Sequence, residues 1–270
     1  MSRYELLSPE GLRIDGRRWN ELRRISAQMS TQSAADGSSY LEQGNTKIIC
    51  TVIGPAEKGS GGAGGAGSGG GGSGKGGEGD ASVIFEVNYA AFSGTERKKR
   101  GRGDKRVAEM QSALQRTFAS VILTHLFPRS EIMITIHILS QDGSVLATCI
   151  NATTLALIDA GIPLYDYVTA CTAGSSSTYM ANEENADPML DLNAIEEGDL
   201  PCLTLATVGG GERIALCNME NKVQLNRLEG MIAVAVGGCA ELRGVLDRVV
   251  RRWGTEVLKR RGVESERVGE

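Results

Sequence analysis

The chain has 270 residues, and its hydrophobic fraction of 41% is enough for a sizeable core. No apolar run approaches the roughly 18 residues that a membrane span needs, and the polar start MSRYELLSPEG lacks the apolar stretch of a secretory signal. We therefore expect a protein that stays inside the cell and has no membrane partner. Its formal net charge is −4.

The cysteines and histidines argue against stabilisation by disulfides or metals. Six cysteines are scattered among apolar neighbours without a CxxC pair, and the chain has only two histidines, His125 and His137. We expect no disulfide framework, no zinc or other metal site and no cofactor. Most of these cysteines are predicted to be buried free thiols: Cys50, Cys149, Cys171, Cys202, Cys217 and Cys239.

Two strands are predicted in the N-terminal third of the chain. Residues 45–55 form a β-branched run, and residues 82–90 alternate apolar and polar side chains as a half-buried strand does. Residues 59–79, which are nearly all glycine, serine and alanine, predict a flexible loop between them. We expect a hairpin whose tip reaches solvent, and the alternative is a linker between two domains.

Further along the chain the hydrophobic period changes to that of a helix. Residues 107–126 predict an amphipathic helix ended by Pro128, and residues 131–139 predict a buried strand. After the turn QDGS, residues 147–163 predict a helix that Gly161 and Pro163 stop. The remaining candidates are strands over 165–174, 202–209 and 213–219, and a long C-terminal helix that includes residues 242–257. The predicted fold class is α+β (mixed α/β), one domain over residues 1–270 with mixed sheets packed against helices.

A basic run stands out against the acidic chain. Residues 96–106, ERKKRGRGDKR, contain seven basic side chains in eleven positions and precede a helix, where positive charge is unfavourable for the helix dipole. A solvated loop is one interpretation, and a surface that binds the phosphate backbone of RNA or DNA is the other. No aromatic residue is interleaved, so we expect backbone contact without base stacking. The candidate RNA-binding residues are Arg97, Lys98, Lys99, Arg100, Arg102, Lys105 and Arg106.

Four segments in order resemble the ribonuclease PH family, and within it the ring subunits of the eukaryotic RNA exosome. They are SPEGLRIDGRRWNELRRI, YLEQGNTKIICTVIGP, DKRVAEMQSAL and DGSVLATCINATTLALIDAGIP. The resemblance covers roughly residues 8–260 and implies a single ribonuclease PH-like domain. The glycine-rich segment 59–79 departs from the family by expanding a loop.

The resemblance also implies a chemistry that can be compared with these residues. Active family members cleave the terminal phosphodiester of RNA with inorganic phosphate, using arginines that hold phosphate and two aspartates six residues apart. The family's Gly-Gly-Thr-Arg turn corresponds to residues 143–146, where Leu146 replaces the arginine. Glu197 and Leu203 stand at the aspartate positions, with Asp199 as a nearby candidate replacement. We therefore expect no catalytic residues, because these positions are degenerate.

The expected function is that of a noncatalytic exosome ring subunit. It would contact single-stranded RNA in the central channel through Lys105 and Arg106, and support 3′ to 5′ RNA processing, rRNA maturation and RNA decay by associated nucleases. Two alternatives stay open: an active phosphate-dependent exoribonuclease, and a scaffold without RNA contact. Arg106 could also form an internal ion pair with Glu109 or Glu197.

The resemblance implies partners and a location as well. The partners would be other ribonuclease PH-like ring subunits, cap subunits with RNA-binding domains and a hydrolytic nuclease, in the nucleus, nucleolus and cytoplasm. The segment GLRIDGRR lies at a subunit edge in the family, although alone it could be a surface strand. We assign no catalytic role to its charged residues Arg13, Asp15, Arg17 and Arg18.

Overall fold

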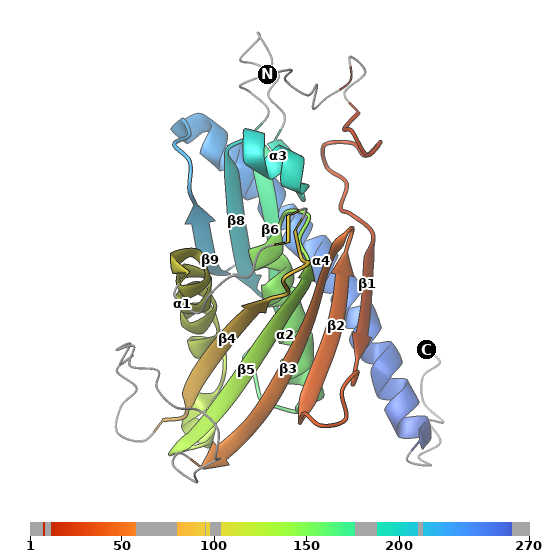
Figure 1. Cartoon of the computed structure of the whole chain (residues 1–270), viewed down its shortest axis with the longest axis vertical. Helices are drawn as coiled ribbons and strands as arrows, with labels where there is room; N and C mark the ends of the chain where they lie inside the picture. Colours follow the sequence, from red (N-terminus) through yellow and green to blue (C-terminus); the bar gives the residue numbers. More distant parts are fainter. Residues whose placement is uncertain are drawn as a thin grey trace.

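The chain forms two β-sheets with helices packed between and beside them (Figure 1). The computed structural model describes residue 8 and residues 12–57, 80–94, 96–97, 104–175, 188–209 and 213–260. The predicted α+β fold class, with sheets packed against helices, is confirmed. The glycine-rich segment 59–79 lies outside the described residues, so the loop and the single-domain organisation stay predictions.

The first sheet contradicts the predicted hairpin. Its strand order is β1-β2-β3-β5-β4, so β5 lies between the two strands that we expected to pair. β5 runs antiparallel to β3 and parallel to β4. The segment that joins β3 to β4 is far longer than the roughly two to five residues of a hairpin loop, so it does not force the two strands to pair. The strands are β1 (Ile25–Met29), β2 (Gly37–Gln43), β3 (Thr46–Glu57), β4 (Ser82–Tyr89) and β5 (Ser130–Ser140).

Two helices pack on the inner face of this sheet. α2 (Val145–Asp159) is buried almost throughout between the sheets, and Gly161, with a φ of +70°, follows its end as predicted. α1 (Lys105–Ala119) ends earlier than the predicted 107–126, and a 3-10 turn follows at Thr124–Leu126. The chain leaves the helix there because Val121 and Ile122 enter the core.

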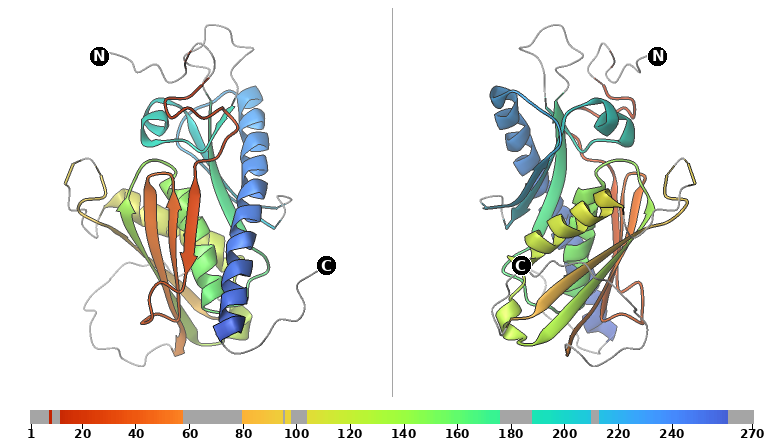
Figure 2. Two further views of the ribbon diagram at one scale, coloured as in Figure 1. Left: turned by 90° about the vertical axis from the view of Figure 1, so that its right-hand side faces the viewer. Right: turned by 60° about the vertical axis from the view of Figure 1, so that its left-hand side comes forward.

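The second sheet lies between α2 and the C-terminal helix, as the two views of Figure 2 show. Its order is β7-β6-β8-β9, and α4 (Leu225–Arg260) covers the face that is turned away from α2. The three predicted strands of this region are found, whereas β7 and the short helix α3 were not predicted. The bounds are β6 (Val168–Ser175), β7 (Pro188–Leu190), α3 (Ala194–Asp199), β8 (Cys202–Val208) and β9 (Arg213–Met219).

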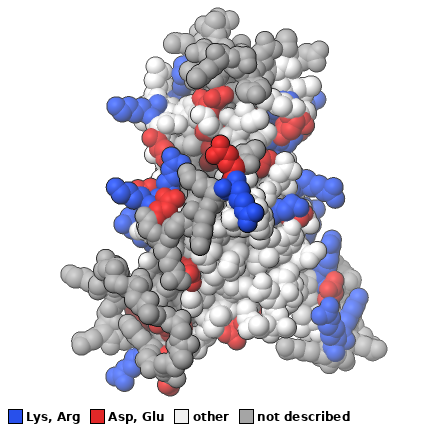
Figure 3. Space-filling model, in the orientation of Figure 1, with Lys and Arg blue, Asp and Glu red and all other residues white. Residues whose placement is uncertain are grey.

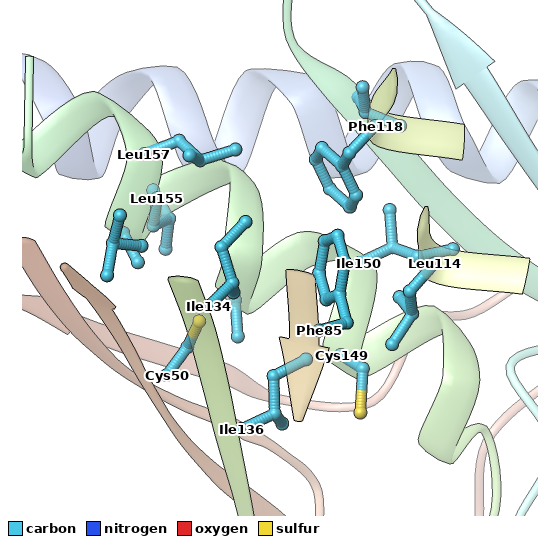
Figure 4. Close-up of a cluster of buried hydrophobic side chains, with 14 of the residues drawn as sticks. Cys50, Phe85, Leu114, Phe118, Ile134, Ile136, Cys149, Ile150, Leu155 and Leu157 are labelled. Atoms are coloured by element: carbon cyan, nitrogen blue, oxygen red, sulfur yellow. The ribbon is translucent and has the colours of Figure 1, made fainter. Parts of the chain in front are cut away.

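The main core lies where α1 and α2 meet the first sheet (Figure 4). The rings of Phe85 on β4 and Phe118 on α1 lie 5.6 Å apart between centroids, in a tilted arrangement. Cys50 and Cys149 are buried in this core, and burial raises the pKa of the Cys50 thiol to about 12. All six cysteines are free thiols, and four of them are buried, as predicted for most. None of the described helices has both the length and the apolar character that crossing a bilayer requires.

Candidate functional site

The 143–146 turn, where the resemblance places phosphate binding, forms the start of α2, of which Val145 and Leu146 are the first residues. Gly143 has a φ of +74° and Ser144 a φ of +54°. A Cβ atom on Gly143 would lie 2.5 Å from the backbone carbonyl oxygen of Leu192 and 2.5 Å from the carbonyl carbon of Asn193. Only glycine permits this approach, so the turn is fixed against the segment that leads into α3.

The first amide of this helix end is already occupied by an anion from the same chain. The backbone N–H of Ser144 donates to Oε2 of Glu197 over 3.1 Å. The Ser144 hydroxyl forms a hydrogen bond with the Thr172 hydroxyl and contacts the carbonyl oxygen of Leu192 at 3.0 Å. A helix N-terminus carries partial positive charge and unpaired N–H groups, and it therefore attracts anions. Here the Glu197 carboxylate takes that place.

Glu197 owes its position to the short helix α3, which the sequence did not predict. At the start of the helix, the backbone N–H of Asn193 donates to Oε2 of Glu196 over 2.9 Å. Successive side chains of a helix point in different directions, so Glu196 and Glu197 contact different parts of the chain. Glu196 contacts Arg13, and Glu197 reaches Ser144.

The environment of Glu197 disfavours its charged form. Burial raises the pKa of this carboxyl above its ordinary value, and the charge of Glu220 adds to the effect, while the Ser144 N–H and the charge of Arg23 act in the opposite direction. Burial, with the charges of Glu197 and Glu220, also raises the pKa of the Cys202 thiol to about 11. Sequence reasoning missed Cys202 and Glu220 as neighbours of Glu197, because neither belongs to a motif.

The two leucines of the degenerate motif take different places. Leu146 is half-buried and packs against the main core, so an apolar contact stands where the family has a guanidinium group. Leu203 is fully buried and packs with Met231 and Ala235 of α4. Side chains alternate along a strand, so Leu203 points to the face of β8 opposite to α2. The structure does not bring Leu203 to Glu197, and Asp199 is exposed at the end of α3.

A buried ion pair joins the N-terminal arm, residues 12–24, to the segment before α3, and its arginine also donates to backbone carbonyl oxygens at the 143–146 turn. Arg23 Nη2 donates to Asp191 Oδ1 over 2.7 Å, and both side chains are buried. Arg23 Nη1 also donates to the carbonyl oxygen of Asp142 over 2.6 Å. Burial alone would raise the pKa of Asp191, but the charge and hydrogen bonds of Arg23 hold this pKa below its ordinary value. No sequence motif pointed to this pair.

Arg13 forms the second contact between the arm and this region. Its Nε donates to Glu196 Oε1 over 2.7 Å, and its Nη1 donates to the carbonyl oxygen of Leu190 over 2.5 Å. Arg13 is buried, but most described residues of this segment are exposed, and they form turns and not the strand that was the alternative interpretation. Arg17 pairs with Asp15 at 2.6 Å and lies in the same arm.

The described residues of the basic run are exposed. Lys105 and Arg106 begin α1, and the backbone N–H of Arg106 donates to the capping side chain of Asp104 over 3.1 Å. Within the described residues, Arg97, Lys105 and Arg106 form no ion pair, and neither Glu109 nor Glu197 pairs with Arg106. In Figure 3, basic and acidic side chains line the left edge at the height of α1, while the surface over β3 and β5 is largely uncharged. Lys98, Lys99, Arg100 and Arg102 lie outside the described residues.

No group of three or more His, Cys, Asp or Glu side chains in the described part of the chain could hold a metal ion.

The profile of the 3′ exoribonuclease family, domain 1 (RNase PH), matches residues 21–163. The chain belongs to the RNase PH family. This RNase PH chain is 40% identical over 254 residues to "Exosome complex component SKI6" of Saccharomyces cerevisiae, covering 93% of the chain and 95% of that relative.

A human relative agrees with this assignment, and a solved structure has a similar fold. The chain is 40% identical over 254 residues to "Exosome complex component RRP41" of Homo sapiens, covering 93% of the chain and 96% of that relative. The crystal structure of Rrp46 from rice (Oryza sativa) superposes with a TM-score of 0.71 at 23% identity, over 88% of this chain and all of that chain. The RNase PH resemblance predicted from the sequence is confirmed. In this RNase PH chain, the anion position at the start of α2 holds an internal carboxylate, and Lys105 and Arg106 at the start of α1 are exposed.

Proposed function

We propose that this chain is a noncatalytic, RNA-contacting subunit of an RNA exosome ring. Relatives at about 40% identity that match almost end to end are named exosome complex components in S. cerevisiae and in human. Its partners would be other ribonuclease PH-like ring subunits, cap subunits with RNA-binding domains and a hydrolytic nuclease. We place its action in RNA processing, rRNA maturation and decay in the nucleus, nucleolus and cytoplasm.

The contact between Ser144 N–H and the Glu197 carboxylate carries the noncatalytic part of this proposal. An inorganic phosphate that approached the start of α2 would meet an anion at the amide and an apolar Leu146 in place of a guanidinium group. Both features oppose the binding of the nucleophile for phosphorolysis. Losing one preorganised electrostatic group costs on the order of 100- to 1000-fold in rate.

The exposed cations carry the RNA-contacting part. Arg97, Lys105 and Arg106 form no ion pair among the described residues, so their charges are available to a polyanion. Guanidinium and ammonium groups bind phosphate oxygens irrespective of the base sequence. A channel contact of this kind guides many different RNAs without selecting among them.

The experiment is a phosphorolysis assay on the ring assembled with this chain and without the hydrolytic nuclease. The ring is incubated with a 3′-tailed RNA, inorganic phosphate and magnesium, and nucleoside diphosphates are measured alongside RNA binding. We expect RNA binding without nucleoside diphosphate release. Release that is lost in the Glu197→Gln or Asp199→Asn variant, but retained in Glu220→Gln, would establish the phosphate-dependent exoribonuclease instead.

A further inference from the structure

Phe92 is an aromatic side chain held out in solvent close to the basic run. It is 71% exposed, more than any other large hydrophobic side chain among the described residues. No aromatic residue lies within 96–106, but Phe92 precedes that run by only four residues. An exposed benzyl group gains little stability from burial, so the fold itself does not explain it.

The loop that carries Phe92 is fastened to the end of β5. The N–H of Ala90 donates to the carbonyl oxygen of Ile138 over 3.0 Å, and the N–H of Gln141 donates to that of Ser93 over 3.0 Å. A further bond from the Ser93 N–H to the Ala90 carbonyl oxygen, also 3.0 Å, closes the turn around Phe92. Three backbone hydrogen bonds therefore fix the backbone of the turn that carries the exposed ring.

This anchor places Phe92 beside the candidate site. Gln141, whose N–H donates to Ser93 of the loop, directly precedes Asp142 and the 143–146 turn. In Figures 1 and 2 the loop that follows β4 stands out at the upper end of the first sheet, below α3. From there the chain continues through the exposed Arg97 to Lys105 and Arg106 at the start of α1. An aromatic ring and three cations therefore border the same end of the sheet.

We propose that Phe92 is a stacking platform for a base of single-stranded RNA, while Arg97, Lys105 and Arg106 hold the phosphate backbone next to it. This inference rests on the RNA contact in the proposed function and adds the base as a second point of contact. Proteins that bind single strands without sequence preference combine cationic grooves with aromatic side chains, because every base presents a π-face.

A contact with another protein would be the other use of an exposed aromatic ring. Aromatic anchors of protein interfaces lie at the centre of a well-packed patch. The neighbours of Phe92 in the loop are Ala91, Ser93 and Gly94, which offer little apolar surface around the ring. The adjoining cations complement a phosphate backbone, so the observations favour RNA.

The test compares two strands of equal length that bind to the assembled ring: an oligouridine RNA and an abasic ribose-phosphate strand. We expect Phe92→Ala to weaken binding of oligouridine about 5- to 150-fold and to leave the abasic strand unaffected, because only the stacking contact is lost. Phe92→Trp should restore binding, and the added tryptophan fluorescence should be quenched by oligouridine. Tyr165→Ala, which removes another ring with 68% exposure, is the matched control and should bind like the wild type.

Two further results separate this inference from the proposed function. Unchanged oligouridine binding by Phe92→Ala, with weaker binding by Lys105→Gln and Arg106→Gln, would overturn the stacking platform and leave the RNA-contacting subunit intact. If Phe92→Ala prevented assembly of the subunit ring, or weakened binding of both RNA strands equally, the Phe92 side chain would be a protein contact. Either result would also overturn the proposal. A wild-type ring that binds neither strand would overturn the RNA contact in the proposed function together with this inference.

Discussion

The 143–146 turn and the start of α1 both present groups that suit phosphate, yet they use them in opposite ways. At the turn, the Ser144 amide is paired with Glu197, and Arg23 is paired with Asp191 inside the protein. At the start of α1, Lys105 and Arg106 are exposed and have no ion pair among the described residues. Donors in the inner region, which comprises the 143–146 turn and Arg23, form hydrogen bonds and an ion pair that stabilise the fold. Cations in the outer region, Lys105 and Arg106 at the start of α1, stay available to a ligand.

The largest effect is expected from breaking the inner region at Arg23. Arg23→Ala leaves the buried Asp191 carboxylate without its partner, and removing one member of a buried pair costs about 3–5 kcal/mol of the free energy of unfolding. Urea unfolding of the purified chain measures this loss.

Arg243→Ala is the control for this prediction. Arg243 pairs with Asp166 at 2.9 Å, but both side chains are more than a third exposed, so the expected loss is only about 0–1 kcal/mol. Equal losses for the two variants would show that the Arg23–Asp191 pair does not hold the inner region together.

Gly143→Ala should have the next largest effect. The new Cβ atom would meet backbone atoms at 2.5 Å, and the residue would have to keep a φ of +74°, which costs about 1–3 kcal/mol before the clash is counted. Gly161→Ala is a matched control, since its φ is +70° and nothing lies within 4 Å of its Cβ position. Thermal unfolding of both variants separates the close approach from the backbone strain, and a larger loss at Gly161 would contradict the packing of the turn.

Neutralising the outer region should change RNA binding and not stability. Lys105→Gln and Arg106→Gln in the assembled ring should each lower the slope of log K against log salt concentration by roughly 0.7, because each removes one phosphate contact with a single strand. Arg213→Gln, an exposed cation on β9, is the control and should leave the slope unchanged. A slope that Arg213→Gln lowers as much as Arg106→Gln would assign the salt dependence to general surface charge.

The smallest effect is a pH dependence that Glu197 introduces. Its pKa is raised in the folded chain, so the folded state binds the proton more tightly than the unfolded state does. This contribution to stability is present below the ordinary pKa of a glutamate and is lost as the pH rises through the raised pKa. Urea unfolding between pH 4 and pH 8 should show the wild type losing stability relative to Glu197→Gln, which cannot titrate. A relative gain with rising pH would mean that the α2 amide stabilises the charged carboxylate more than burial disfavours it.

The sequence predicted those parts of the fold that depend on local periodicity. The apolar period of residues 147–163 and the position of Gly161 predicted α2, alternation predicted β4, and the apolar run 131–139 predicted β5 as a buried strand. The prediction that β3 pairs with β4 was wrong, because strand order depends on long-range packing and not on which strands are adjacent in the sequence.

The candidate site was predictable only where a motif carried it. Gly143, Leu146 and Glu197 followed from the resemblance, but the direction of Glu197 depends on the turn of α3, and the face of Leu203 depends on the register of β8. Arg23 was missed because a buried pair across 168 positions leaves no local pattern. Phe92 was missed because it lies outside the basic run, and no local pattern in the sequence shows that its side chain is exposed.

Photo-crosslinking of a 4-thiouridine RNA to the assembled ring, followed by mass spectrometry of the crosslinked peptides, tests both regions at once. The account predicts crosslinks in this chain at residues 92–106 and none at the 143–146 turn or at Glu197. Crosslinks concentrated at the turn and at Glu197, with none at residues 92–106, would contradict it, because RNA would then occupy the position that we assign to the chain's own carboxylate.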